Sequence, residues 1–350
     1  MGTKAIPVLA AGGNLDTRRV GPAKGPANFK TPWYLRNGHV QTLVGYFISG
    51  NLPALVTTTL PVDLGDGDRL LLHITQPQNW LPEQPSVLLV HGLTGSHRSS
   101  HVVRVASMLE RMGWRVARAD LRGAGEGFGL ARKLYHVGQS GDLLLAARAF
   151  MANAPDSPLA VVGFSLGGNI VLKLALEATG SMLAQMAAVV AICPPVDPEA
   201  CVGRITSGKF RVYDRVFYAG LKRDWEARRE LFPDLPSIHL PRRGSLRDYD
   251  ELITAPLNGY GSAAEYYRDN TTAHRLTGLT LPTFIVAAAD DPVVTLKPLE
   301  DLAARDDLPA NIRLELTARG GHLGFMDNGP TSARWAERRV VEWLAGILGG

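Results

Sequence analysis

Residues 159–169 read Leu-Ala-Val-Val-Gly-Phe-Ser-Leu-Gly-Gly-Asn, an apolar β-rich run that enters a Gly-x-Ser-x-Gly pattern. The residues that follow, 170–176, favour a helix. A serine on such a tight strand-to-helix turn projects its hydroxyl from the end of a sheet. Gly163 and Gly167 suit that turn, because a Cβ at either position would collide with the neighbouring strand and helix. The pattern predicts Ser165 as a nucleophile, and a glycine-rich turn with an idle serine is the alternative.

Two later strand ends supply candidates for the acid and the base that a nucleophilic serine requires. An apolar run at 281–289 ends in Asp290 and Asp291. A short alternating run at 313–317 leads to His322, which lies between glycines and an apolar flank. The chain order serine, acid, histidine is the order expected around this kind of turn. A turn before proline and a surface-loop histidine are the alternative readings of these residues.

An earlier apolar run, 86–90, leads into His91-Gly92-Leu93. Acyl transfer passes through a tetrahedral oxyanion that two backbone N–H groups stabilise. One donor is the residue after the nucleophile, Leu166, and we expect Leu93 to supply the other. We interpret His91 as a structural residue that shapes this loop.

The order of apolar runs indicates an α/β protein. After a first antiparallel hairpin, strands alternate with helices, which predicts a mostly parallel, doubly wound sheet of eight strands. The expected strands are 55–62, 69–75, 86–91, 114–119, 159–163, 186–193, 281–289 and 313–317. Helices are expected at about 103–112 and 332–348, and residues 1–30 are expected to form an irregular arm before the main domain, 31–350.

The interval from about 195 to 280 interrupts this alternation and is rich in aromatic residues. An insertion after the sixth expected strand overhangs the predicted nucleophile, so we expect a helical cap there. The alternative is an ordinary set of packed helices in which the aromatic residues form core.

Composition argues against a nucleic-acid-binding protein, a disulfide-rich secreted protein and a membrane-spanning protein. The chain has 350 residues and a net charge of +4 without a dense basic run, which gives nucleic-acid binding little support. The two cysteines, Cys193 and Cys201, make no disulfide framework and fit a reducing compartment. No apolar segment approaches the ~18 residues of a membrane span. We therefore expect a cytoplasmic protein.

Two patterns that suggest other chemistry are weak. The glycine-rich stretch 120–129 follows a strand, but no register of it gives the Gly-x-Gly-x-x-Gly of a dinucleotide site. His97 and His101 are four residues apart, but no matching carboxylate motif accompanies them. We expect neither a cofactor nor a metal.

Four segments carry a resemblance to a known family: 37–42, 134–142, 245–250 together with 259–260 and 265–267, and 290–292. From about residue 30 onward the chain resembles the α/β-hydrolase superfamily and, within it, the YheT-like branch. That branch is related to ABHD-type lipid hydrolases and to yeast medium-chain ester synthases and esterases. Its members usually have proline where this chain has Gly38.

The resemblance implies an esterase or lipid-hydrolase chemistry with Ser165 as nucleophile, Asp291 as acid and His322 as base. Asp290 is then expected to stabilise its turn or to accept from a backbone N–H, and Asp197 is the fallback acid.

We predict a serine hydrolase that cleaves short- to medium-chain carboxylic esters through an acyl-enzyme. An acyltransferase or ester synthase, a lipase or phospholipase, and a non-catalytic binding protein of the same fold are the alternatives. The lack of a long amphipathic membrane helix favours modest-length substrates over bilayer lipids. The sequence leaves the alcohol moiety and the oligomeric state open.

Overall fold

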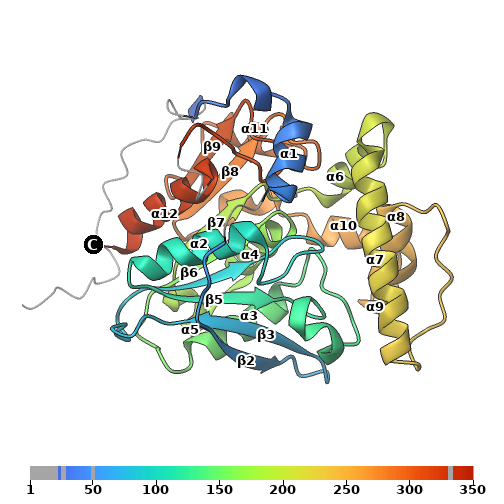
Figure 1. The fold of residues 1–350 in the computed structure, drawn as a ribbon, viewed down its shortest axis with the longest axis horizontal. Helices are drawn as coiled ribbons and strands as arrows, with labels where there is room; N and C mark the ends of the chain where they lie inside the picture. Colours follow the sequence, from blue (N-terminus) through green and yellow to red (C-terminus); the bar gives the residue numbers. More distant parts are fainter. Residues whose placement is uncertain (1–22, 25–28, 49–51, 330–333, 350) are drawn as a thin grey trace, which may run out of the picture.

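The computed structural model describes residues 23–24, 29–48, 52–329 and 334–349. Within them nine strands form one sheet, in the order β1-β9-β8-β7-β6-β4-β5-β3-β2 (Figure 1). The strands are β1 (Ala23–Lys24), β2 (Thr58–Asp63), β3 (Arg69–Thr75), β4 (Ser86–Val90), β5 (Arg115–Asp120), β6 (Leu159–Phe164), β7 (Met186–Ile192), β8 (Thr283–Ala288) and β9 (Ile312–Thr317).

The predicted topology is confirmed, with one strand added. β2 pairs with β3, and β3 with β5, in antiparallel fashion, while the other pairs are parallel. The added strand is β1, whose two residues pair with Glu315 and Leu316 at the edge of the sheet. β1 falls within the expected irregular arm, most of which lies outside the described residues. An Ala-Lys pair has no alternating pattern, so only its pairing with β9 makes it a strand.

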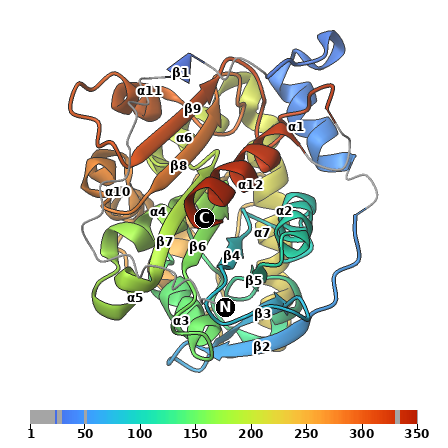
Figure 2. The same ribbon diagram turned by 90° about the vertical axis from the view of Figure 1, so that its left-hand side faces the viewer.

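Helices cover both faces of the sheet, as Figure 2 shows. Alternate residues of β6 point to opposite faces: Val161 packs in the core beneath α3 and α4, and Val162 packs in the core beneath α2 and α12. The helices outside the insertion are η1 (Trp33–Leu35), α1 (Gly38–Phe47), α2 (Ser100–Arg111), η2 (Gly125–Leu130), α3 (Ser140–Met151), α4 (Leu166–Glu177), α5 (Gly180–Gln185), α11 (Lys297–Ala303) and α12 (Trp335–Leu348).

The segment between β7 and β8 is helical and builds a core of its own. Its helices are α6 (Pro198–Ile205), η3 (Gly208–Phe210), α7 (Arg211–Leu231), α8 (Leu246–Tyr249), the π-helical turn η4 (Asp250–Thr254), α9 (Ala255–Leu257), α10 (Ala263–Asn270) and η5 (Ala273–Gly278). Tyr218, Trp225 and Tyr267 are buried in this core, so many of the aromatic residues pack helices together. The lid role of this insertion stays a prediction.

Candidate active site

Ser165 lies on a strained turn between β6 and α4. Its backbone has φ 52° and ψ −124°, a conformation that L-residues rarely adopt. The neighbouring glycines permit this turn: a Cβ on Gly163 would lie 2.2 Å from the oxygen of Gly167, and a Cβ on Gly167 would lie 2.4 Å from the oxygen of His91. The Ser165 N–H donates to the carbonyl of Ile192 on β7 at 2.8 Å. The tight approach of β4, β6 and α4 therefore fixes where the hydroxyl projects.

The structure brings the three predicted catalytic side chains together. His322 Nε2 lies 2.8 Å from Ser165 Oγ, and His322 Nδ1 lies 2.8 Å from Asp291 Oδ2. The imidazole thus bridges a hydroxyl and a carboxylate that come from the ends of β6 and β8. This geometry lets one ring nitrogen accept the serine proton while the other donates to the carboxylate.

Asp291 is held in one orientation by its own turn. Its Oδ1 accepts from the backbone N–H groups of Val293 and Val294, at 2.7 and 2.9 Å, which leaves Oδ2 for His322. The side chain is buried. Two backbone donors and one imidazole therefore satisfy a carboxylate that would be costly to bury alone.

The other two carboxylates considered from the sequence lie elsewhere. Asp290 Oδ1 accepts from the N–H of Gly321 at 2.8 Å and so braces the turn before His322. Burial raises the pKa of Asp290, and the neighbouring Asp291 adds to the shift. Asp197 caps the N-terminus of α6 by accepting from the N–H of Ala200. Neither carboxylate has a hydrogen bond to His322 among the described residues.

Thr42 on α1 holds the backbone of His322, a role that the sequence did not predict. Its Oγ1 accepts from the His322 N–H at 2.8 Å and donates to the carbonyl of Gly38 at 2.7 Å. Both residues belong to the 37–42 motif, which carried the family resemblance without an assigned role. A Cβ on Gly38 would lie 2.0 Å from the carbonyl oxygen of Asp290, so α1 packs directly against the loop of the acid.

The loop after β4 lies beside the nucleophile. A Cβ on Gly92 would come within 3.0 Å of the Ser165 Cβ. Leu93 follows in this loop, and both Leu93 and Leu166 line the same pocket as Ser165. Leu166 begins α4, where a backbone N–H has no acceptor within the helix. The structure thus places Leu93 and Leu166 at the pocket of Ser165, and the oxyanion role of their two amides stays a prediction.

His91 contacts backbone groups with both ring nitrogens, as expected of a structural residue in this loop. Its Nδ1 lies 2.7 Å from the carbonyl oxygen of Gly92, and its Nε2 accepts from the N–H of Leu121 at 3.2 Å. Burial lowers the pKa of His91. A neutral imidazole with a proton on Nδ1 satisfies both contacts, so His91 ties the loop after β4 to the end of β5.

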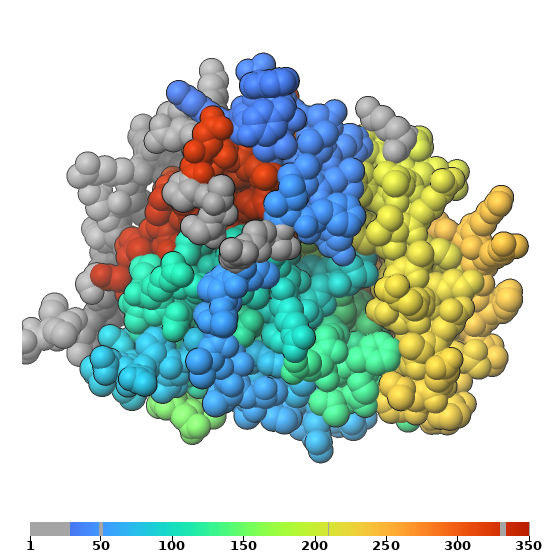
Figure 3. Space-filling view, viewed as in Figure 1, coloured from blue at the N-terminus to red at the C-terminus, as the bar shows by residue number. Residues whose placement is uncertain are grey.

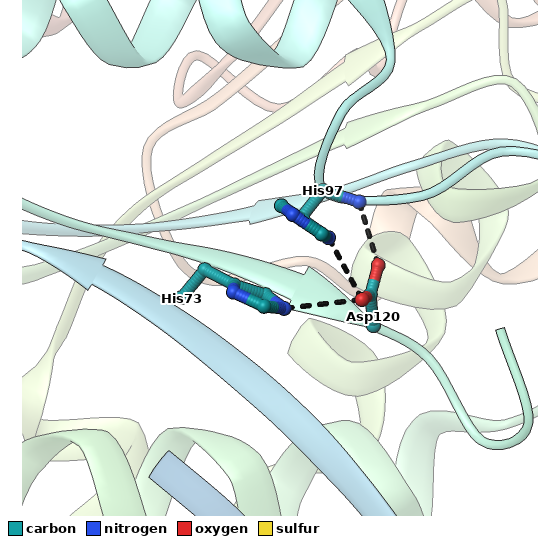
Figure 4. A group of neighbouring side chains, drawn as sticks. All are labelled: His73, His97 and Asp120. Atoms are coloured by element: carbon teal, nitrogen blue, oxygen red, sulfur yellow. Dashed lines mark hydrogen bonds and ion pairs between the residues drawn. The ribbon is translucent and has the colours of Figure 1, made fainter. Parts of the chain in front are cut away.

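A second set of hydrogen bonds anchors the same loop through Asp120, at the end of β5 (Figure 4). Asp120 Oδ2 lies 3.1 Å from His73 Nε2 and 2.8 Å from His97 Nδ1, while Oδ1 accepts from the His97 N–H at 2.7 Å. The Glu126 N–H also donates to Oδ2. Burial alone would raise the pKa of Asp120, but the hydrogen bonds from His73 and His97 hold it below its usual value.

These three side chains are close enough together to be considered as metal ligands. However, the rings of His73 and His97 stack with their centroids 3.5 Å apart and their planes at 16°. The ring nitrogens that face Asp120, His73 Nε2 and His97 Nδ1, both already contact its Oδ2. Arg98 Nε also donates to His97 Nε2 at 3.2 Å. The geometry fits a hydrogen-bonded support for the loop rather than a metal centre.

Cys193, Asp291 and His322 form the other close group of this kind in the described chain. Burial raises the pKa of the Cys193 thiol well above its ordinary value, and Asp291 adds to the shift. A thiol that stays protonated is a poor metal ligand. Cys193 and Cys201 are both free and buried, which agrees with the absence of a disulfide framework.

A pocket of about 730 Å³, including its opening to solvent, begins at Ser165 and extends into the inserted helices. Its apolar wall includes Leu134, Val202, Ile205 and Leu221. Part of the wall is polar and is formed by a histidine, an aspartate, a threonine and three tyrosines from α8 and α10. The residues of this polar region are His136, Tyr249, Asp250, Thr254, Tyr266 and Tyr267.

Asp250 is the buried acid of this polar region. Thr254 Oγ1 donates to its Oδ1, and the Tyr267 hydroxyl donates to its Oδ2, both at 2.7 Å. Burial raises the pKa of Asp250 to about 6, although these hydrogen bonds and the charge of Arg247 oppose the shift. The π-helical turn that holds both Asp250 and Thr254 turns them toward the pocket, and such turns often occur at functional sites.

The raised pKa of Asp250 predicts a pH-dependent stability. A carboxyl whose folded pKa exceeds its unfolded value stabilises the fold fully below the unfolded value, and this stability is lost as pH rises through about 6. We expect the difference in Tm between Asp250→Asn and wild type to shift in favour of the variant from pH 4 to pH 7. Thermal unfolding across this range measures it. A difference in Tm between the two proteins that stays constant from pH 4 to pH 7 would contradict the raised pKa of Asp250.

The remaining candidates from the sequence are placed as follows. His97 contacts Asp120, whereas His101 on α2 packs against the ring of Phe164, with centroids 4.5 Å apart. Burial lowers the pKa of His101 to about 3.

Across the described residues, no helix is both long and apolar enough to cross a membrane.

Comparison with known proteins agrees with the fold. The alpha/beta hydrolase fold family matches residues 85–329. The YheT protein of Escherichia coli (strain K12) is 30% identical over 291 residues, which cover 82% of this chain and 84% of YheT. Phospholipase ABHD3 of Homo sapiens is 25% identical over 354 residues, covering 98% of this chain and 85% of the human protein.

Two solved structures share the fold at low sequence identity. The Pyrococcus furiosus esterase Pf2001 superposes with a TM-score of 0.55 at 18% identity, covering 86% of this chain and 98% of that esterase. Est1E of Butyrivibrio proteoclasticus gives a TM-score of 0.53 at 20% identity, covering 83% of this chain and all of Est1E. The family match and the likeness to YheT show that the chain belongs to the alpha/beta hydrolase fold family and, within it, to the YheT-like branch.

Proposed function

We propose that the chain is a carboxylic ester hydrolase in which Ser165 is the nucleophile, His322 the general base and Asp291 the residue that orients the base. The observation that carries this proposal is the bridging position of the imidazole, 2.8 Å from both the hydroxyl and the carboxylate, at a pocket with apolar walls. Relatives named as esterases and lipases support the same class of activity.

The reaction follows from the positions of these atoms. His322 Nε2 takes the Ser165 proton as Oγ attacks the ester carbonyl carbon, and the resulting oxyanion accepts from the N–H groups of Leu93 and Leu166. The imidazolium, which Asp291 stabilises, then protonates the leaving alcohol. The acyl-enzyme that remains is hydrolysed by a water that His322 deprotonates in turn, which returns Ser165 to its starting form.

We propose acyl chains of short to medium length as the substrate class. The pocket wall that includes Leu134 and Leu221 is apolar, which suits an acyl chain beside the nucleophile. Transfer of the acyl group to an alcohol instead of water would use the same side chains. Lipase or phospholipase activity is the other variant, and product analysis separates these outcomes. A non-catalytic binding role is disfavoured because it requires no imidazole between a serine and an acid. We also propose a cytoplasmic location.

The acyl pocket predicts a chain-length profile. Each methylene buried in an apolar site adds about 0.8 kcal/mol, so kcat/KM should rise several-fold per CH₂ from acetyl esters until the pocket is full. A series of p-nitrophenyl esters measures this. Val202→Phe, which fills part of the wall, should move the optimum to a shorter chain, whereas Val212→Phe on the exposed side of α7 should not. A flat profile from acetyl to decanoyl esters would refute the acyl pocket.

A further inference from the structure

The helix α1 has its apolar side facing solvent. Its protein-facing side is made of small or polar residues, since Gly38, Gln41 and Thr42 are buried. Its outer side carries Val40, Leu43, Tyr46 and Phe47, and the last two side chains are each 74% exposed. A surface helix of a globular protein normally shows the opposite arrangement. Exposing this apolar side therefore has a cost in free energy.

The inner side explains why the helix cannot simply be turned over. Thr42 holds the His322 backbone, and Gln41 donates to the Met326 carbonyl while accepting from the Met326 N–H. A Cβ on Gly45 would lie 3.1 Å from the Cα of Gly324, so larger residues do not fit on this side. Contacts with the loop of His322 thus fix the orientation of α1, and its apolar side stays outward.

The exposed surface extends beyond the helix on both ends. Trp33 is 79% exposed and Tyr34 is 61% exposed on η1, and Ile48 is 59% exposed directly after α1. Figure 3 shows this segment, in blue, at the surface beside the inserted helices, in yellow. We call residues 33–48 the aromatic surface segment. Several large apolar side chains exposed within one short segment indicate an interaction site.

The chemistry of the aromatic surface segment indicates which partner it fits. Tryptophan and tyrosine are the side chains favoured at the boundary between a bilayer and water, because their rings are apolar at one end and polar at the other. Between Phe29 and Ile48 the sequence contains Lys30, Arg36 and His39 but no acidic residue. Arg319 also lies here, donating to the Arg36 carbonyl. Asp290 lies on the opposite, protein-facing side, against Gly38.

We propose that the aromatic surface segment docks the protein on a lipid surface with anionic headgroups. The apolar side chains of α1 enter the boundary of the bilayer, while Arg36 and Lys30 contact the headgroups. Because the inner side of α1 holds the loop of His322, docking brings the proposed active site to the lipid surface. Esters that partition into membranes thereby become accessible, in addition to dissolved ones. This last step rests on the proposed function, whereas the docking itself does not.

Vesicle binding tests the docking. Co-sedimentation is measured with vesicles of phosphatidylglycerol and phosphatidylcholine and with vesicles of phosphatidylcholine alone. Wild type should bind the anionic vesicles, more weakly as salt is raised, and Ser165→Ala should bind equally well. The double variant Tyr46→Ser/Phe47→Ser should bind at least tenfold more weakly. Arg36→Glu should weaken binding to anionic vesicles about tenfold and leave binding to neutral ones almost unchanged.

The matched control is Leu81→Ser/Leu231→Ser, which removes two apolar side chains that are 53% and 54% exposed elsewhere on the chain and should bind as wild type. All variants should hydrolyse a water-soluble aryl ester at the wild-type rate, apart from Ser165→Ala, so a fold defect would be detected. Absence of wild-type binding at low salt, or equal binding by the Tyr46/Phe47 variant, would overturn the proposal. A concentration-dependent dimer that this variant abolishes would also overturn it, by assigning the surface to a second copy of the chain.

Discussion

The Ser165→Ala variant is expected to lose ester turnover, with kcat falling by about 10⁴- to 10⁶-fold. The hydroxyl is the only group at this position that can attack the ester carbonyl, and His322 has no proton to transfer without it. Alanine fits the turn as well as serine does, because the strain at φ 52° is a property of the backbone. Steady-state kinetics with an aryl ester measure the loss.

The control for this variant is Ser207→Ala, which removes a hydroxyl that donates to the Arg204 carbonyl at the start of the inserted helices. It should keep wild-type kcat. Both variants should unfold within a few degrees of wild type, since neither side chain fills core space. Turnover by Ser165→Ala within tenfold of wild type would remove Ser165 from the mechanism.

The second large effect is expected from Asp291→Asn, with a loss in kcat on the order of 10⁴. The N–H groups of Val293 and Val294 require an oxygen at the Oδ1 position. The amide nitrogen of asparagine must then face His322 Nδ1, where it donates instead of accepting. Nδ1 becomes the acceptor, so the proton moves to Nε2, which can no longer take the proton of Ser165. The pH dependence of kcat together with the residual rate measures this change.

Asp290 and Asp197 serve as controls, because each has the same charge as Asp291 but different hydrogen-bond partners. Asp290→Asn retains an oxygen for the Gly321 N–H, and Asp197→Asn retains a cap for α6. Both variants should keep activity within about tenfold of wild type. Full activity of Asp291→Asn combined with a large loss in either control would move the acid to that residue.

Local patterns in the sequence were enough to predict the parts of the site that lie at strand ends. The Gly-x-Ser-x-Gly turn, the Asp290-Asp291 pair and the loop of His322 each follow an apolar run, and parallel strands bring their carboxyl ends to one edge. The central strands β4, β5, β6 and β8 were predicted for the same reason, since each is a continuous apolar or fully buried run. The edge strand β1 was not, because its two residues become a strand only through pairing with β9.

The supporting contacts could not be predicted, because they join residues that are far apart in the chain. Thr42 is 280 positions from His322, and His73 is 47 positions from Asp120. No local period records such a pairing. The lack of a long amphipathic membrane helix favoured dissolved substrates, yet α1 exposes an apolar side over ten residues. Which side of α1 faces solvent depends on its packing against the loop of His322, and the sequence pattern alone does not record it.

For the pocket, too, the sequence shows which residues are present but not where they lie in the fold. The aromatic residues of the insertion were visible in the sequence, but their separation into core and pocket was not. Trp225 packs inside the insertion, whereas Tyr249 and Tyr267 also line the cavity that begins at Ser165. Asp250 belonged to the stretch 245–250 that carried part of the family resemblance, and only its contacts with Thr254 and Tyr267 indicate what it does.

Covalent labelling with a fluorophosphonate, followed by peptide mapping, tests the central claim most directly. The reagent phosphonylates a serine hydroxyl only where a base activates it, so it reports on Ser165 and His322 without any assumption about the natural substrate. The account predicts a single adduct per chain, located on Ser165, that is absent from Ser165→Ala and much slower to form in His322→Ala. An adduct on another residue, or undiminished labelling of Ser165→Ala, would contradict it.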